Sequence, residues 1–114
     1  MIAAVADAAT VANKPLGSVQ ANGKVNVIVI SGNTAYLGGA FTAMRPAGST
    51  TGGTTRNHAA AVDLSTGALL PWNPNVNKAV NSLAVSGSTV YIGGVFSTVG
   101  TASRKNIAAV NSTT

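Results

Sequence analysis

The sequence predicts an all-β protein built from antiparallel sheets, and three observations lead to this prediction: the composition, an internal repeat and regularly spaced turn residues. The chain has 114 residues, of which 46% are hydrophobic, 4% aromatic and 8% charged. Val and Thr favour strands, while Gly, Asn and Ser supply turn conformations. The hydrophobic content is sufficient to fill the core of a domain of this size. The composition therefore favours short strands joined by tight turns and disfavours helices.

The chain matches itself over two long segments. Residues 25–42 match residues 80–97, with Val25 aligned to Val80 at an offset of 55 residues. Residues 56–63 match residues 104–111, with Arg56 aligned to Arg104 at an offset of 48 residues. Most mismatches exchange one apolar residue for another or one small polar residue for another. The seven-residue difference between the offsets indicates an insertion within residues 45–55, on a surface loop.

The repeat predicts three parts of unequal length. Residues 1–24 form the tail of a preceding repeat, because residues 2–5 are identical to residues 107–110. Residues 25–79 form a complete repeat that contains the insertion, and residues 80–114 form a truncated repeat. The chain thus contains about two and a fraction repeats of roughly 48 residues, a period close to that of a propeller blade. We expect the array to be completed by other copies of the chain or by further repeats.

Four short strands are predicted in the complete repeat, at Val25 to Ile30, Ala35 to Phe41, Ala59 to Asp63 and Ala68 to Trp72, with turn residues between them. The apolar runs at residues 27–30 and 83–85 are continuous. In an antiparallel sheet with one face exposed to water, apolar and polar residues would alternate along each strand instead. We therefore expect both faces of each sheet to be covered, as they are when a sheet is stacked between two others.

Three motifs carry a resemblance to a known family. The pattern V-N-x-L-A-V-S-G-S-T-V-Y-I-G-G-x-F lies at Val80 to Phe96, R-x-N-I-A-A-V at Arg104 to Val110, and L-P-W-N-P-N-V-N at Leu70 to Asn77. This string resembles the β-propeller-like tandem repeats of large bacterial and archaeal surface and secreted proteins. The resemblance implies propeller-type blades, an extracellular or cell-surface location and a role in binding or adhesion. It covers nearly all of the chain.

The first repeat departs from this pattern at two places. It carries the seven-residue insertion, and the preceding segment Pro15 to Ala21 lacks the Trp-Asn-Pro element. These departures argue against a regular closed ring. The first ten residues have no basic leader and include Asp7, so they do not resemble a signal peptide.

Two kinds of residue recur at equivalent positions and are expected to have structural roles. The pairs Gly38-Gly39 and Gly93-Gly94 lie inside predicted strands, where glycine marks a bulge or a close approach of sheets. No Lys-Ser/Thr follows them to complete a phosphate-binding loop. Arg56 and Arg104 also recur, which favours a repeated contact, such as hydrogen bonds to loop carbonyls, over a single active site.

The segment around Trp72 is the best candidate for ligand recognition. Trp72, Asn73 and Asn75 place an aromatic ring beside amide side chains, an arrangement that packs on the face of a sugar. The other interpretation is that Trp72 covers the core at the end of a strand. Because tryptophan is usually largely buried, the structural interpretation is favoured.

The sequence offers little acid–base or metal-binding chemistry. The candidates are Asp7, Asp63 and His58. Asp63 precedes Ser65-Thr66-Gly67 and is expected to accept backbone hydrogen bonds in that turn, since the equivalent Asn111 makes the same turn without being a base. His58 has too few partners for zinc, and a carboxylate-rich calcium loop is missing. We therefore predict no catalytic residues, no metal and no cofactor.

The charge pattern also disfavours several partners. Seven Lys and Arg residues against two Asp residues give a net charge of +5, but the basic residues are scattered and only Arg104 and Lys105 are adjacent. A nucleic-acid site would cluster them. No apolar run approaches the roughly 20 residues that span a bilayer. The predicted function is a non-enzymatic structural, assembly or attachment module that associates with itself into a ring or filament; the alternative is a carbohydrate-binding module.

Overall fold

The computed structural model describes residues 19–46 and 53–112, and within these ranges the chain is all-β with antiparallel pairing throughout. The strands are β1 (Gln20–Ala21), β2 (Val25–Ser31), β3 (Thr34–Gly39), β4 (Ala43–Arg45), β5 (Thr54–Thr55), β6 (Ala59–Asp63), β7 (Val80–Ser86), β8 (Thr89–Gly94), β9 (Thr98–Val99), β10 (Ala102–Ser103) and β11 (Ile107–Asn111).

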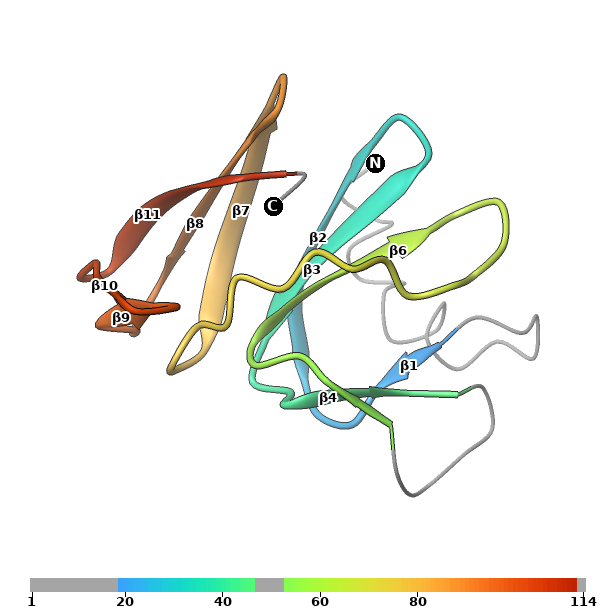
Figure 1. The fold of residues 1–114 in the computed structure, drawn as a ribbon, viewed down its shortest axis with the longest axis horizontal. Helices are drawn as coiled ribbons and strands as arrows, with labels where there is room; N and C mark the ends of the chain where they lie inside the picture. Colours follow the sequence, from blue (N-terminus) through green and yellow to red (C-terminus); the bar gives the residue numbers. More distant parts are fainter. Residues whose placement is uncertain (1–18, 47–52, 113–114) are drawn as a thin grey trace.

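Two three-stranded sheets form the body of the molecule, one from each repeat (Figure 1). We call β2–β3–β6 the first sheet and β7–β8–β11 the second sheet. Strand β7 lies against β2 and β3, so the two sheets pack face to face. Short strands at one end of each sheet form two smaller ladders, β1–β4–β5 and β9–β10.

The two sheets, formed by the two matching segments of the sequence, have the same register. In the first sheet Tyr36 of β3 pairs with Val29 on one side and Ala61 on the other. In the second sheet Tyr91 of β8 pairs with Ala84 and Ala109, the equivalent residues. The register shifts at the start of both β2 and β7, between Val25 and Val27 and between Val80 and Ser82. Each sheet therefore begins with the same bulge.

An asparagine before the first strand of each sheet holds in place the loop that follows the second strand. Asn22 Oδ1 accepts hydrogen bonds from the backbone N–H groups of Thr42 and Ala43, at 2.8 and 2.9 Å. Asn77 Oδ1 accepts the same bonds from Ser97 and Thr98, at 2.9 and 3.0 Å. An unsatisfied buried or partly buried N–H is costly, so one amide side chain serves two donors in each repeat.

The left-handed backbone position before each third strand is also repeated. His58 and Asn106 both have a φ of 69°, and each N–H donates to the carbonyl of a phenylalanine, Phe41 or Phe96. Asparagine tolerates this conformation better than most residues. His58 thus occupies a turn position at which the second repeat has an asparagine, Asn106.

The glycine pairs make the close approaches that were predicted. A Cβ on Gly39 would lie 2.2 Å from the Lys24 carbonyl oxygen, and a Cβ on Gly94 would lie 2.2 Å from that of Ala79. These contacts occur beside the bulges, where only glycine fits. Gly38 faces the second sheet, and a Cβ there would lie 2.5 Å from Val80 Cγ1.

The core has two parts, which correspond to the two faces of the first sheet. One lies between the sheets and contains Tyr36, Ala59, Ala61, Trp72, Val76, Val80, Val90, Ile92, Phe96 and Ala108. The other lies on the opposite face of the first sheet and contains Ala35, Leu37, Phe41, Met44, Ala60 and Val62. The continuous apolar run at residues 27–30 predicted two covered faces. Strands β3 and β6 have buried residues on both faces, whereas residues 27–29 of β2 are only half-buried and Ile30 is exposed.

The second sheet contradicts that prediction within this chain. Burial alternates along β7, and Tyr91 and Ile107 are exposed on the face turned away from the first sheet. The prediction of two covered faces is wrong here because the described residues place a neighbouring sheet on one side only.

Other expectations need correction at the level of single elements. The predicted strand at Ala68 to Trp72 is reduced to one bridge between Val62 and Leu69, because Pro71 cannot donate to a ladder. Strand β3 ends at Gly39 rather than Phe41. The five short strands of the small ladders were not predicted. In residues 19–46 and 53–112 the sheets close into neither a barrel nor a ring.

Some predictions fall on residues outside the described ranges. They are most of the tail assigned to residues 1–24, including Asp7 and the match at residues 2–5, part of the segment Pro15 to Ala21, and the centre of the insertion at residues 45–55.

Candidate interaction surface

The exposed side of the second sheet presents a flat, largely apolar surface. Side chains alternate between the two faces of a strand, and the pairing of β7, β8 and β11 places six residues on this surface. We call these residues the outer face: Ser82, Ala84, Tyr91, Gly93, Ile107 and Ala109. Tyr91 is 45% exposed and Ile107 is 68% exposed. Large apolar side chains that share an exposed face mark a contact surface more often than scattered single ones do.

Each residue of the outer face has an equivalent in the first sheet, on the face that packs against the second sheet. The equivalents are Val27, Val29, Tyr36, Gly38, Ala59 and Ala61. Tyr36 is only 8% exposed and Ala59 is completely buried, whereas their counterparts Tyr91 and Ile107 are open. Equivalent positions thus form two surfaces in the chain, one covered by a sheet and one uncovered, with identical residues at three of the six positions.

The covered copy shows which contacts a second sheet makes. Val80 is fully buried and lies above Gly38, which leaves room for its methyl groups. Asn26 donates through Nδ2 to the Val80 carbonyl at 3.1 Å and to Asn81 Oδ1 at 2.9 Å. On the outer face, Gly93 takes the place of Gly38. Asn81, the equivalent of Asn26, is bonded in the first junction through its Oδ1. The glycine that leaves room at the first junction is therefore repeated at the second sheet.

Trp72 lies between the two sheets rather than at the surface. The indole is 4% exposed and meets Tyr36 edge to face, with ring centroids 5.2 Å apart and an interplanar angle of 86°. Its Nε1–H donates to the Asn111 carbonyl of the second sheet at 3.0 Å. This buried position agrees with the structural interpretation of Trp72, because the residue joins Tyr36 of one sheet to β11 of the other.

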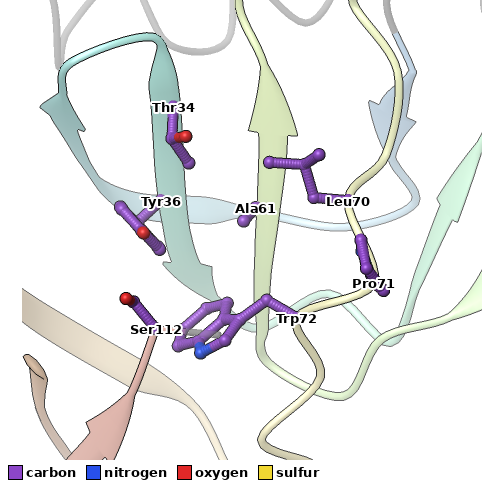
Figure 2. Close-up of a pocket in the computed structure, with 7 residues that line it drawn as sticks. All are labelled: Thr34, Tyr36, Ala61, Leu70, Pro71, Trp72 and Ser112. Carbon is purple, nitrogen blue, oxygen red and sulfur yellow. The ribbon is translucent and has the colours of Figure 1, made fainter. Parts of the chain in front are cut away.

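A cavity of about 360 Å³ opens beside this contact, and Figure 2 shows the side chains around it. Its wall is lined by Thr34, Tyr36, Ala61, Leu70, Pro71, Trp72 and Ser112. The indole edge and three hydroxyl groups face it, and no charged side chain does among the residues that line it. The geometry does not favour stacking of a sugar on Trp72, since the ring is enclosed by protein.

The two asparagines predicted to assist Trp72 lie on the loop that leads to the second sheet. Asn73 and Asn75 are both exposed. Asn75 adopts a positive φ of 57°, accepts from Asn57 Nδ2 at 2.8 Å and accepts from the Gly100 N–H through its carbonyl. Asn75 thus has a turn-forming role, and its side chain and Trp72 do not converge on one ligand site.

The two arginines make the predicted bonds to backbone carbonyls. Arg56 Nη1 donates to the Thr55 carbonyl at 2.9 Å and Arg104 Nη1 donates to the Ser103 carbonyl at 2.8 Å. Arg56 Nη2 also donates to the Leu70 carbonyl at 3.1 Å. Both residues fix the loop before the third strand of their sheet.

The two described groups with acid–base potential are occupied by structural bonds. His58 Nδ1 lies 2.6 Å from the Val76 carbonyl oxygen. Asp63 Oδ1 accepts from the Ser65 N–H, the Ser65 hydroxyl and Asn33 Nδ2, at 2.8, 2.6 and 3.0 Å. Within the described ranges, no three His, Asp or Glu side chains gather as metal ligands.

The pKa of Asp63 is lowered from its ordinary value, chiefly because the Ser65 hydroxyl and then the Ser65 N–H donate to the carboxylate. A carboxyl group with a lower pKa in the folded state stabilises the fold above its unfolded pKa. That contribution is lost as the pH falls through the lowered folded value. We expect Ser65→Ala to raise the midpoint of the Asp63 carboxyl titration measured by NMR. An unchanged midpoint in Ser65→Ala, with Ser112→Ala as the control, would contradict this assignment.

Comparisons with protein-family models, with curated proteins and with solved structures found no significant match. The residues that the structure describes contain no helix long and apolar enough to cross a membrane.

Sequence reasoning did not single out the residues that define the outer face. Tyr36 and Tyr91 are aligned in the repeat, as are Asn26 and Asn81. The signal that would have identified them is identity between the two copies combined with alternation along each strand. The direction in which each residue points becomes clear only from the register of the sheets.

Proposed function

We propose that the chain is a non-enzymatic assembly module in which propeller-type blades stack face to face. In this role the outer face binds another sheet of the same repeat, supplied by another copy of the chain or by a further repeat. The observation that supports the proposal is the contrast between Tyr36, buried under the second sheet, and Tyr91, exposed at the equivalent position of the outer face.

The energetics favour such contact. Covering an apolar surface contributes roughly 25 cal/mol for each Å² removed from water. The junction inside the chain also buries few charges, since its core contains apolar and aromatic residues alone. Head-to-tail use of one such surface produces a ring if the rotation between copies closes and a filament if it does not.

The cellular setting of this proposal rests on the resemblance to repeats of surface and secreted proteins. An array of stacked sheets there would serve attachment or adhesion. The chain contains no cysteine, so these sheets are stabilised by packing and hydrogen bonds without disulfides.

Self-association tests the proposal directly. We expect the chain to form oligomers whose mass in sedimentation equilibrium rises with concentration, and Ile107→Lys to weaken this association at least tenfold by placing a charge on the outer face. Leu64→Lys is the matched control, because Leu64 is 43% exposed and lies in the turn after β6, away from the outer face.

Salt gives a second measure of the same association. The net charge of +5 makes copies repel one another. Added salt should therefore strengthen association through an apolar surface. A chain that stays monomeric at high concentration and high salt, with Ile107→Lys behaving identically, would overturn the proposal of self-association.

A further inference from the structure

The turn at Asn22-Gly23, between β1 and β2, contains a chemically labile dipeptide. It is the only Asn-Gly pair in the sequence. Asparagine amides are among the thermally labile groups of proteins. They are lost when the backbone nitrogen of the next residue attacks the side-chain carbon Cγ, and glycine hinders this attack least because it has no Cβ. Gly23 is exposed, so solvent reaches the attacking nitrogen.

The carboxamide of Asn22 is held at both of its polar atoms. Its Oδ1 accepts hydrogen bonds from the N–H groups of Thr42 and Ala43, at 2.8 and 2.9 Å. Its Nδ2 donates to the Thr42 hydroxyl at 3.0 Å. Two N–H groups directed at a carbonyl oxygen stabilise the negative charge that this oxygen gains when a nucleophile adds to its carbon. The bonds that hold the loop therefore also activate Cγ for attack.

The attacking nitrogen belongs to a backbone N–H that is not engaged elsewhere. The Gly23 N–H makes no hydrogen bond to a residue in the described ranges. The next carbonyl along the chain, that of Lys24, accepts from the Ala40 N–H at 2.8 Å. The chain is thus fixed after the glycine and free at its nitrogen. Attack on Cγ begins without the loss of a hydrogen bond at the nucleophile.

We propose that Asn22 is a site of intramolecular deamidation in the folded chain. Hydroxide removes the Gly23 amide proton, and the nitrogen bonds to Asn22 Cγ to form a tetrahedral intermediate whose oxyanion is Oδ1. The Cγ–Nδ2 bond then breaks, and Nδ2 leaves as ammonia after taking a proton from water. The resulting succinimide is opened by one water molecule to aspartate or isoaspartate. The overall reaction consumes one water and releases one ammonia.

The two products have different effects on the fold. An aspartate carboxylate accepts the same two N–H groups, and hydrogen bonds to a charged acceptor are stronger than those to a neutral one. It loses only the bond that Nδ2 donates to the Thr42 hydroxyl. Isoaspartate instead lengthens the backbone between β1, which pairs with β4, and β2, which pairs with β3. We therefore expect aspartate to preserve both pairings and isoaspartate to loosen the β1–β4 ladder.

The second repeat contains a matched control site. Asn77 Oδ1 accepts from the N–H groups of Ser97 and Thr98, and Asn77 Nδ2 donates to Ser97 Oγ at 3.0 Å. The following residue is Lys78, whose Cβ crowds the attacking nitrogen. Both Asn77 and Lys78 are exposed, so access of solvent does not separate the two sites. They differ chiefly in the residue that supplies the nucleophile.

The test is incubation of the full chain at mildly alkaline pH, with peptide mapping by mass spectrometry at intervals. We expect Asn22 to be converted at least about tenfold faster than Asn77, the ratio that a barrier difference of about 1.4 kcal/mol produces. Gly23→Lys should slow Asn22 to the rate of Asn77, and Lys78→Gly should raise Asn77 to the rate of Asn22. Each variant receives the residue that the other repeat already has at this position.

Two results would overturn the inference. One is equal conversion of Asn22 and Asn77 in the original chain, a comparison that depends on no variant. The other is much slower conversion of Asn22 in the folded chain than in a synthetic peptide of residues 19–27, which would show that the bonds from Thr42 and Ala43 protect the amide. Conversion at least as fast as in the peptide supports activation by these donors. The inference does not use the outer face, so the oligomeric state of the chain does not decide it.

Discussion

Trp72→Ala is expected to lower the free energy of unfolding by about 3–5 kcal/mol, the range observed when a buried large aromatic residue is truncated. Trp72 is 4% exposed, contacts Tyr36 of the first sheet and donates to the Asn111 carbonyl of the second. Its removal leaves a cavity at the junction and removes the hydrogen bond to the Asn111 carbonyl. Single domains are stable by only about 5–15 kcal/mol, so a large part of the stability depends on this side chain.

Urea denaturation of the purified variant measures this effect, and Trp72→Phe separates its two causes. Phenylalanine retains a ring against Tyr36 but has no N–H for the Asn111 carbonyl. We expect it to cost less than alanine, although more than the roughly 1 kcal/mol of one hydrogen bond, because it is also smaller. A Trp72→Ala variant as stable as the original chain would show that the two sheets are held together without this residue.

Gly38→Ala is expected to destabilise the chain by about 1–3 kcal/mol, because it adds a carbon to a packed junction. The new Cβ would lie 2.5 Å from Val80 Cγ1 and 3.1 Å from Val27 Cγ1. Val80 is fully buried and has little freedom to move. The sheets must therefore separate slightly.

Gly93→Ala is the matched control, because Gly93 is the equivalent glycine on the outer face. Its Cβ would meet Ser82 Oγ at 2.5 Å, and Ser82 is an exposed side chain that can rotate away. We expect a much smaller loss in the denaturation midpoint of the monomer, together with weaker self-association. Equal losses for Gly38→Ala and Gly93→Ala would contradict the assignment of Gly38 to a packed junction.

The elements that depend on local sequence were the ones that could be predicted. Residues 59–63 form β6 with the predicted bounds, since alanine and valine lie between clear turn residues there. The glycine pairs lie beside bulges, and Asp63 accepts hydrogen bonds within its turn. In each case the chemistry of a few neighbouring residues determines the conformation.

Burial could not be predicted in the same way. Tyr36 and Tyr91 lie in nearly identical local sequences, yet one is buried and the other exposed. The difference comes from the presence of a neighbouring sheet, which local sequence does not encode. The fourth strand of the repeat was overestimated for a related reason. Pro71 ends its pairing early, and Trp72 gains more from packing on Tyr36 than from continuing along β6.

The central claim is that the outer face is a stacking surface that is open in the monomer and covered in the assembly. Nitration of tyrosine at increasing protein concentration, followed by mass spectrometry, tests it most directly, because the described residues contain one equivalent tyrosine in each environment. We expect Tyr36 to be protected at all concentrations and Tyr91 to react at low concentration and become protected as oligomers form. Equal reaction of Tyr91 at every concentration would contradict the claim.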